Sequence, residues 1–426
     1  MPNPRRLLRR FLLRLFLLGI PAVLAAVLII AWAPEIAPVA PPDRASFAQD
    51  TVIRGATLAA LGDCAVCHTV PDGRPYAGGR GVPTPFGTVF ATNITPDPDT
   101  GIGRWSLAAF TRAMRDGVAR DGAHLYPALP YPHFTKATDD DIAAMYAFLM
   151  TRTPVARTAP ANTLRFPFNY RPLIAAWNVL FLTPERWTPD ASKDAEWNRG
   201  AYLVDAIGHC GACHTPRNPI GAEENTMAFT GGDAEGWYAP SLRAAIPAPW
   251  SIDALVTYLR TGLDRGHGVA AGPMAPVTRE LATVPDTYVH AIAVYVASLV
   301  PGGGMPSAAE AKAPVKRQVA ASPEFDGACG GCHGNNAPMT LRGAPSLALS
   351  TAVNAPTARN VVDIILHGLP WREGHAGPFM PGFAGALTDA QVAALAAYVR
   401  VRYSDQPAWR DVDSSVREAR REGDGS

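Results

Sequence analysis

The chain has 426 residues with 38 lysines and arginines against 37 aspartates and glutamates, a formal net charge of +1. A chain of this length can form about three domains of ~150 residues each. Because the net charge is close to zero, we expect no nucleic-acid or polyanion partner.

The N-terminus joins a basic segment to an apolar one. Residues 1–14 contain five arginines, and residues 15–33 contain no charged residue. An apolar segment of this length can cross a bilayer, and the arginines place residues 1–14 in the cytoplasm. A cleavable signal peptide is the alternative, but Pro34 would then follow the cut. We expect a single retained anchor in a bacterial inner membrane, with the rest of the chain in the periplasm.

The pattern Cys-x-x-Cys-His occurs three times and uses all six cysteines. On one helical turn these three side chains share a face, so two thioether bonds can hold a porphyrin while the histidine ligates its iron. Zinc sites would need paired motifs at short spacing, whereas these motifs are more than one hundred residues apart. We therefore predict three covalently bound haem c groups. The predicted attachment sites are Cys64, Cys67, Cys210, Cys213, Cys329 and Cys332, and the predicted proximal ligands are His68, His214 and His333.

The sequence after each motif repeats. A stretch with helical spacing ends in a glycine, which is a common helix terminator. Twelve residues later comes a leucine or methionine in a proline-rich loop, and a helix with core periodicity follows. The glycines are Gly117, Gly262 and Gly368, and the loop residues are Leu129, Met274 and Met380. This order predicts an all-α fold of three tandem class I cytochrome c domains after an N-terminal transmembrane helix.

The domain boundaries follow from the repeat and from composition. The connector is rich in aromatic residues and proline, which indicates a strap packed across the first two domains or a surface that docks a partner or lipid. A stretch rich in glycine, alanine and proline indicates a flexible linker. The predicted segments are domain 1 at 46–155, the connector at 156–192, domain 2 at 193–301, the linker at 302–319, domain 3 at 320–405 and a solvated polar tail at 406–426.

The loop residues predict the sixth iron ligands. A methionine opposite histidine raises the reduction potential of a haem, and Met274 and Met380 fit this role. Leu129 occupies the first slot and cannot ligate iron. We predict His133 as the sixth ligand there, with a five-coordinate iron or a helix methionine as alternatives. Without methionine ligation, the first haem should have a lower potential than the other two.

The sequence contains no catalytic apparatus of its own. It has no glycine-rich dinucleotide fingerprint, and no Ser/His/Asp set or carboxylate pair stands out. The chain is therefore predicted to be a non-catalytic electron-transfer subunit that serves a separate dehydrogenase. A haem peroxidase with an open first iron is an alternative that only Leu129 supports. A haem sensor would need an output domain, for which the chain has no room.

Several long motifs resemble those of the triple-haem cytochrome c subunits of bacterial membrane-associated periplasmic dehydrogenases. The motifs are Thr84-Pro85-Phe86-Gly87, Thr92-Asn93-Ile94-Thr95-Pro96-Asp97, Gly101-Ile102-Gly103-Arg104-Trp105-Ser106, Tyr126-Pro127-Ala128-Leu129-Pro130-Tyr131, Trp197-Asn198-Arg199-Gly200-Ala201-Tyr202-Leu203 and Gly208-His209-Cys210. The resemblance implies electron transfer from a dehydrogenase to ubiquinone or to a terminal cytochrome or oxidase.

The resemblance also implies three kinds of partner. Members of this family serve quinohaemoprotein alcohol dehydrogenases containing pyrroloquinoline quinone, flavin-dependent gluconate or sugar dehydrogenases, or molybdenum hydroxylases that oxidise aldehydes or N-heterocycles such as isoquinoline or nicotinate. The alcohol dehydrogenase branch has methionine where this chain has Leu129. Residues 123–135 and 266–274 are more similar to the molybdenum branch. We therefore expect a molybdenum hydroxylase partner with a separate iron–sulfur subunit.

Overall fold

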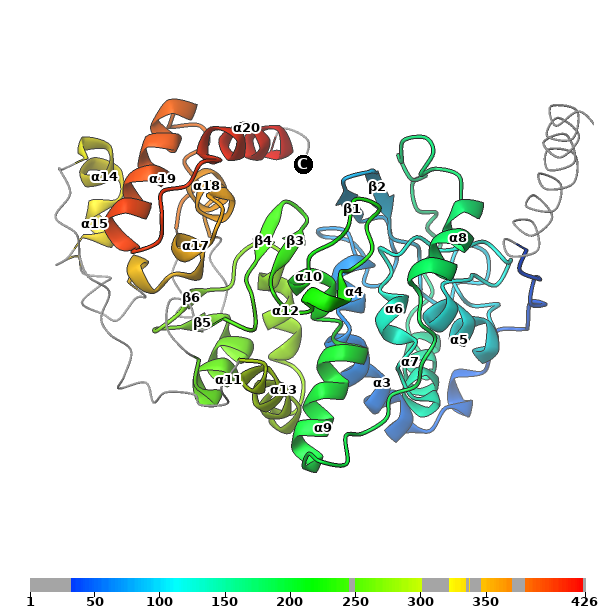
Figure 1. Cartoon of the computed structure of the whole chain (residues 1–426). Coiled ribbons are helices and arrows are strands. Elements are labelled where there is room, and N and C mark those ends of the chain that lie inside the picture. Colours follow the sequence, from blue (N-terminus) through cyan, green and yellow to red (C-terminus); the bar gives the residue numbers. More distant parts are fainter. Residues whose placement is uncertain are drawn as a thin grey trace, which may run out of the picture. The chain divides into compact units, whose positions relative to one another are not determined.

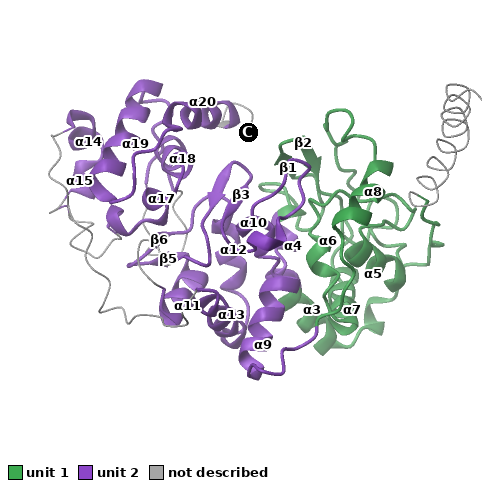
Figure 2. Ribbon diagram, in the orientation of Figure 1, with its two compact units in different colours: residues 1–58, 67–187 green, residues 59–66, 188–426 purple. Residues whose placement is uncertain are grey.

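The computed structural model describes residues 32–244, 250–300, 322–334, 337, 346–369 and 380–423. The chain divides into two compact units (Figure 2): unit 1 comprises Met1–Leu58 and Cys67–Trp187, and unit 2 comprises Ala59–Val66 and Thr188–Ser426. Most of the predicted anchor at 15–33 and the whole predicted linker at 302–319 lie outside the described residues. Within the described ranges, no helix is both long and apolar enough to cross a membrane.

The first part of the chain is mostly helical (Figure 1). Its elements are η2 (Arg44–Ser46), α3 (Gln49–Leu61), α4 (Cys64–Cys67), β1 (Gly81–Thr84), β2 (Gly87–Phe90), α5 (Leu107–Asp116), α6 (Tyr131–Phe134), α7 (Asp139–Met150) and α8 (Pro172–Phe181). Helices α5 and α7 are preceded by the N-cap residues Ser106 and Thr138, whose side chains accept hydrogen bonds from backbone N–H groups of the first turn. Their starting points are thus set by the local sequence.

Helices α3 and α7 cross closely inside unit 1. A Cβ atom added to Gly55 of α3 would lie 1.9 Å from the carbonyl oxygen of Ala144 in α7. Only glycine fits at this crossing. Ile142 and Met145 of α7 are buried beside it, as their helical spacing predicts.

Unit 2 contains the remaining elements, and its part from Ala195 to Ser298 repeats this order. It contains α9 (Ala195–Tyr202), η3 (Leu203–Ile207), α10 (Gly211–His214), η4 (Asn225–Met227), β3 (Gly232–Ala234), β4 (Trp237–Ala239), α11 (Ile252–Thr261), β5 (Leu263–Asp264), β6 (Gly268–Val269), α12 (Met274–Leu281), α13 (Asp286–Ser298), α14 (Pro323–Ala328), α15 (Gly330–His333), η6 (Leu347–Leu349), α17 (Thr351–Asn354), α18 (Arg359–His367), α19 (Asp389–Tyr403) and α20 (Val412–Gly423). The crossing of α9 and α13 matches that of α3 and α7, because a Cβ added to Gly200 would lie 1.9 Å from the carbonyl oxygen of Ala291.

Short antiparallel hairpins supplement the helices, and an all-helical prediction does not include them. Strand β1 pairs with β2, and β3 pairs with β4. Gly87, the first residue of β2, has φ 125°, and Gly236, in the turn between β3 and β4, has φ 86°, conformations that favour glycine. The hairpins lie between each of the first two Cys-x-x-Cys-His motifs and the next long helix. The helical framework was predicted correctly, but these strands of two to four residues are too short to leave a periodic signal.

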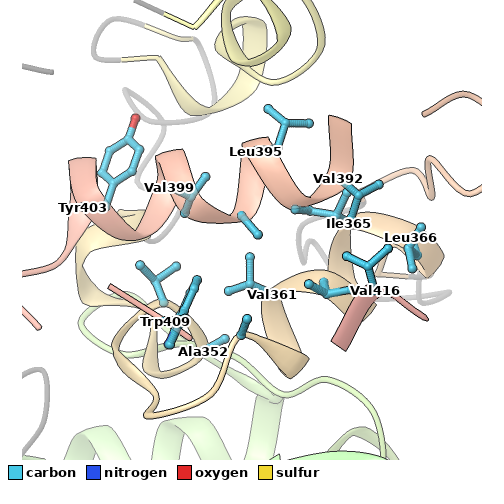
Figure 3. Packing of buried hydrophobic residues seen from close by; sticks show 14 of the residues in the cluster. Ala352, Val361, Ile365, Leu366, Val392, Leu395, Val399, Tyr403, Trp409 and Val416 are labelled. Carbon is cyan, nitrogen blue, oxygen red and sulfur yellow. The ribbon is translucent and has the colours of Figure 1, made fainter. Parts of the chain in front are cut away.

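The C-terminal part of unit 2 has its own apolar core, formed by α18, α19 and α20 (Figure 3). The prediction that residues 406–426 form a solvated tail is wrong for α20. Val416 and Ala419 are each 1% exposed, and Trp409 is 9% exposed. Val412, Val416 and Ala419 recur at helical spacing and form an apolar stripe, while the arginines and acids occupy the other face.

The β3–β4 hairpin and α18 are linked within unit 2 by a pair of reciprocal hydrogen bonds. The Tyr238 N–H donates to Asn360 Oδ1, and Asn360 Nδ2 donates to the Tyr238 carbonyl, both at 2.8 Å. Beside this pair, Arg359 Nη2 donates to Glu422 Oε1 at 2.6 Å. The C-terminal core is thus attached to the rest of unit 2 by specific polar contacts.

Candidate haem-attachment sites

The second and third Cys-x-x-Cys-His motifs each lie on a single helical turn, as their spacing predicts, and in the first motif His68 directly follows the helical turn. The His214 N–H donates to the Cys210 carbonyl at 3.0 Å, and the His333 N–H donates to the Cys329 carbonyl at 2.8 Å. Cys64 and Cys67 are the first and last residues of α4. None of the six cysteines forms a disulfide. In each motif, two thiols and one imidazole therefore lie on one helical face, the arrangement that covalent porphyrin attachment requires.

Two of the motif histidines are held by backbone carbonyl groups. His68 Nδ1 lies 2.6 Å from the Thr92 carbonyl oxygen, and His214 Nδ1 lies 2.6 Å from the Pro240 carbonyl oxygen. Because a carbonyl can only accept, Nδ1 must carry the proton in both rings, which leaves the Nε2 lone pair available. A metal-ligating histidine has this tautomer and this kind of outer hydrogen bond.

Burial favours the uncharged form of all three motif histidines. Burial lowers the pKa of His68 and His214, and the hydrogen bonds to the Thr92 and Pro240 carbonyls only partly oppose this shift. Burial also lowers the pKa of His333. Most of the loop that follows His333 lies outside the described residues. Neutral imidazole is the form that binds iron, so the donor set fits a haem group.

The residues that hold these histidines were not predicted. Thr92 follows the β1–β2 hairpin, and Pro240 follows β3–β4. The chain returns to each motif in the same way, since the Gly78 N–H donates to the His68 carbonyl at 2.7 Å and the Gly231 N–H donates to the His214 carbonyl at 2.9 Å. A backbone carbonyl can come from any residue type, so the sequence does not mark Thr92 or Pro240. Only an alignment of the two hairpin segments could have indicated that they are equivalent.

The three stretches of twelve residues that lead from a helix-ending glycine to Leu129, Met274 or Met380 begin in the same way. Gly117, Gly262 and Gly368 all have positive φ, at 62°, 71° and 72°, and each ends its helix. The chain then forms a short antiparallel bridge. These bridges pair Val118 with His124, β5 with β6, and Leu369 with Met380.

Leu129 and Met274 come after these bridges in the chain, and Met380 is itself part of one. Met274 is the first residue of α12. Met380 pairs with Leu369 through hydrogen bonds of 2.8 and 3.1 Å, and residues 370–379 between them lie outside the described residues. Leu129 precedes α6, where His133 lies one helical turn further on. Met274, Met380 and His133 stay predictions as sixth ligands.

The loop that leads to Met274 is fixed by His267. Its ring stacks on Trp250 with centroids 3.6 Å apart, and its Nδ1 lies 2.8 Å from Asp264 Oδ1. Burial works against the charge on Asp264, but hydrogen bonds from His267 and the Gly266 N–H outweigh it and lower the pKa of this carboxyl. These contacts hold the β5–β6 turn in place before the slot.

Within unit 2, the residues that precede Cys64 pack against the second motif. His209 Nε2 lies 3.2 Å from the Gly62 carbonyl oxygen. Burial raises the pKa of the neighbouring Asp63 to about 7, with Glu280 raising it further and Arg279 opposing it. The segment before the first motif is thus integrated into the unit that contains the second.

Comparisons with known proteins agree with this architecture. Residues 52–153 match the cytochrome c family, and residues 319–399 match the family described as cytochrome C oxidase, cbb3-type, subunit III. The chain is 50% identical over 397 residues to a nicotinate dehydrogenase subunit of Pseudomonas putida; the match covers 91% of this chain but only 33% of that protein. The chain therefore spans about a third of the length of this relative.

Two relatives of similar length match over most of their sequence. The chain is 33% identical to the fructose dehydrogenase cytochrome subunit of Gluconobacter japonicus, covering 88% of this chain and 83% of that one. It is 36% identical to the gluconate 2-dehydrogenase cytochrome c subunit of Pantoea cypripedii, covering 83% and 86%. The chain therefore belongs to the family of dehydrogenase cytochrome c subunits, electron-transfer proteins with covalently bound haem c.

Proposed function

We propose that this chain carries three haem c groups in three tandem cytochrome c domains and conducts electrons away from a separate dehydrogenase. The observation that carries the proposal is the matched pair of hydrogen bonds from His68 to Thr92 and from His214 to Pro240, both at 2.6 Å. The two pairs orient the two rings alike, with Nε2 free for iron. The third motif, ending in His333, has the same helical turn.

The six cysteines would hold the haem groups, and His68, His214 and His333 would supply the proximal nitrogen. Met274 and Met380 would supply the sixth ligand of the second and third groups, and His133 that of the first. When bound, haem supplies an iron that takes up and releases one electron at a time, at a potential set by these axial ligands. Leu129 then makes the first site the one of lowest potential and suits it to receive electrons.

The preferred partner is a molybdenum hydroxylase that oxidises an aldehyde or an N-heterocycle and has a separate iron–sulfur subunit. Support comes from the 50% identity to the nicotinate dehydrogenase relative, and from the resemblance of residues 123–135 and 266–274 to this branch. A quinoprotein alcohol dehydrogenase or a flavin gluconate dehydrogenase is the alternative, supported by relatives with 33–36% identity. The electrons would pass to ubiquinone or to another cytochrome.

The proposed location is the periplasmic side of a bacterial inner membrane, with residues 15–33 as a single anchor. The uncharged run at 15–33 and the arginines before it support this. Covalent haem requires export of the domains, and an anchor would keep them near a membrane acceptor.

Haem content and complex composition test this proposal. The intact mass and the alkaline pyridine spectrum should both give three haems per chain, and replacing Cys329 and Cys332 by alanine should leave two. The native complex should contain molybdenum. If the complex contains pyrroloquinoline quinone or flavin and lacks molybdenum, the preferred partner is wrong. A wild-type chain with fewer than three haems would contradict the haem assignment.

A further inference from the structure

Helix α8 and the residues before it belong to unit 1 (Figure 2) and carry several exposed apolar side chains. We call this set the α8 patch. Between residues 166 and 184 the sequence has one charged residue, Arg171. Phe166 is 84% exposed and Leu180 is 69% exposed. The α8 patch consists of Phe166, Phe168, Tyr170, Leu173, Val179 and Leu180.

Helix α8 differs from an ordinary surface helix in being apolar both on the face that packs against unit 1 and on an exposed face. Leu173, Ala176 and Leu180 share one helical face, and all three are exposed. The opposite face holds the helix to unit 1, where Ala175 is buried and Asn178 Oδ1 accepts a hydrogen bond from the Tyr131 hydroxyl at 2.6 Å. A surface helix normally turns its apolar residues inward. A fixed apolar face directed outward indicates a contact with something apolar.

The segment that leaves the predicted anchor is fixed to the same loop as α8. The Ile36 N–H donates to the Arg120 carbonyl at 2.8 Å, and Arg112 Nη1 donates to the Pro34 carbonyl at 2.7 Å. A Cβ added to Gly122 would lie 2.2 Å from the Ala33 carbonyl oxygen. The last residue of the anchor, Ala33, therefore lies directly against residue 122.

Arg171, the residue that precedes α8, contacts the same loop only two residues further along, at His124. Arg171 Nη1 donates to the His124 carbonyl at 2.9 Å, and its guanidinium lies 5.1 Å from the centre of the Tyr126 ring. Residues 122 and 124 are separated by two Cα–Cα steps of about 3.8 Å each. The start of α8 and the exit of the anchor are therefore fixed on one short stretch of backbone, so an anchor in the bilayer holds the start of α8 close to the bilayer.

The composition of the two segments fits lipid as the occupant. Trp32, at the end of the apolar run, is 74% exposed, and tryptophan and tyrosine are enriched where membrane meets water. The patch contains both aromatic and aliphatic side chains and no acidic residue. Its neighbour Arg171 has a cationic group that anionic headgroups attract.

We propose that the α8 patch lies in the interfacial layer of the inner membrane and is a second contact with lipid beside the anchor. This inference rests on the membrane anchoring in the proposed function. It fixes unit 1 at the membrane surface by two points rather than one, so the domain cannot rotate freely about its anchor.

A photo-crosslinking amino acid at position 180 of the full-length chain, in native membranes, tests this proposal. Position 53 is the matched control, because Ile53 is an apolar residue of unit 1, on helix α3, with 56% exposure. Irradiation should give a lipid adduct, detected by mass spectrometry, in several-fold higher yield at position 180 than at position 53. A second probe at Leu173 should lose its lipid adduct when Val179→Glu and Leu180→Glu are added, while the haem spectrum stays unchanged.

The outcomes separate this proposal from the one it rests on. An adduct between position 180 and another polypeptide would overturn lipid as the occupant in favour of a protein partner, and equal yields at positions 180 and 53 would also overturn it. Carbonate extraction of the same membranes tests the anchor. A chain that is retained but gives no lipid adduct refutes only the α8 patch, whereas a chain that is extracted refutes both. Haem content, measured separately, tests the haem assignment of the proposed function.

Discussion

Gly200 of α9 lies against the backbone of Ala291 in α13, so closely that a Cβ at residue 200 would be 1.9 Å from the Ala291 carbonyl oxygen. Nothing flexible could yield at this crossing, because the nearest atoms are backbone. Gly55 and Ala144 form the matching contact in unit 1. Both crossings thus depend on the absence of a single methyl group.

The first prediction follows from this contact. Gly200→Ala should destabilise the protein by about 1–3 kcal/mol or more, the usual cost of forced overpacking. Gly327→Ala is the matched control, since Gly327 is also helical and a Cβ there meets nothing within 4 Å. It should be stabilising by about 0.5–1 kcal/mol, because alanine is the better helix former. Calorimetric unfolding of the two haem-loaded variants measures both, and equal effects would contradict the crossing geometry.

The second prediction concerns the first slot. Leu129→Met should raise the potential of one haem toward the other two, because it offers a thioether where there is none. Met274→Leu is the converse change and should lower the potential of a different haem. Spectroelectrochemical titration of the full chain measures all three potentials. If Leu129→Met leaves every potential unchanged even in the His133→Ala background, the twelve-residue spacing does not place residue 129 at the iron.

The third prediction concerns His133. If His133 is the sixth ligand, His133→Ala should convert one haem from low spin to high spin, and added imidazole should restore the low-spin spectrum. Leu129→Met in the His133→Ala background should also restore it. A wild-type chain that already contains one high-spin haem would instead indicate a five-coordinate first iron, and the histidine assignment would be wrong.

The fourth prediction is a pH dependence at Asp363 of α18. This residue is 3% exposed, and its Oδ2 has no hydrogen-bond partner among the described residues. Burial raises the pKa of its carboxyl to about 7; Arg359 opposes the shift and Glu422 adds to it. The unfolded value is about 3.9, so the folded chain holds this proton more tightly. The resulting stability is complete below about pH 4 and is lost as the pH rises toward 7.

Asp363→Asn should remove the loss of folding stability between pH 4 and pH 8, because an amide does not ionise. The variant should unfold at a higher temperature than the wild type at pH 8, by an amount equivalent to at most about 4 kcal/mol, and at a similar temperature at pH 4. Asp413→Asn, at an exposed position of α20, is the control and should leave the difference between the two pH values unchanged. A wild-type stability that is equal at pH 4 and pH 8 would rule out the buried carboxyl as its source.

The fifth prediction concerns α20. Val416→Asp places a charge at a site that is 1% exposed and should unfold the C-terminal core, since an unpaired buried charge costs several kcal/mol. Arg417→Asp lies on the exposed face of the same helix and should have a small effect. Proteolysis of residues 346–423 in both variants distinguishes the two positions. Equal resistance would mean that α20 does not pack as described.

Much of the helical framework could be predicted because it rests on strong local signals. Gly117 and Gly262 end their helices in the left-handed conformation, and this role is visible from glycine alone. Each Cys-x-x-Cys-His motif fixes its own helical turn. The helix α20 could not be predicted in this way, because its apolar stripe has only three members among alternating charges and gains its stability from α18 and α19.

The candidate sites could be predicted only in part, for a similar reason. The motif histidines carry a sequence signature, but Thr92 and Pro240 act through backbone carbonyls that any residue could supply. Their positions depend on the hairpins, and these depend on glycines such as Gly87 and Gly236, whose purpose is clear only in three dimensions. His133 has no equivalent in the other two repeats. The repeat pattern that predicts Met274 and Met380 as sixth ligands therefore cannot predict the sixth ligand of the first site.

The paired hydrogen bonds between Tyr238 and Asn360 join two parts of unit 2 that are 122 residues apart in the sequence. Two such bonds contribute only about 1 kcal/mol each, too little to hold separate molecules together. A covalent connection makes the encounter intramolecular, at an effective concentration on the order of millimolar. The contact between the β3–β4 hairpin and α18 therefore depends on both partners belonging to one chain, and cleavage of the chain between them should weaken it.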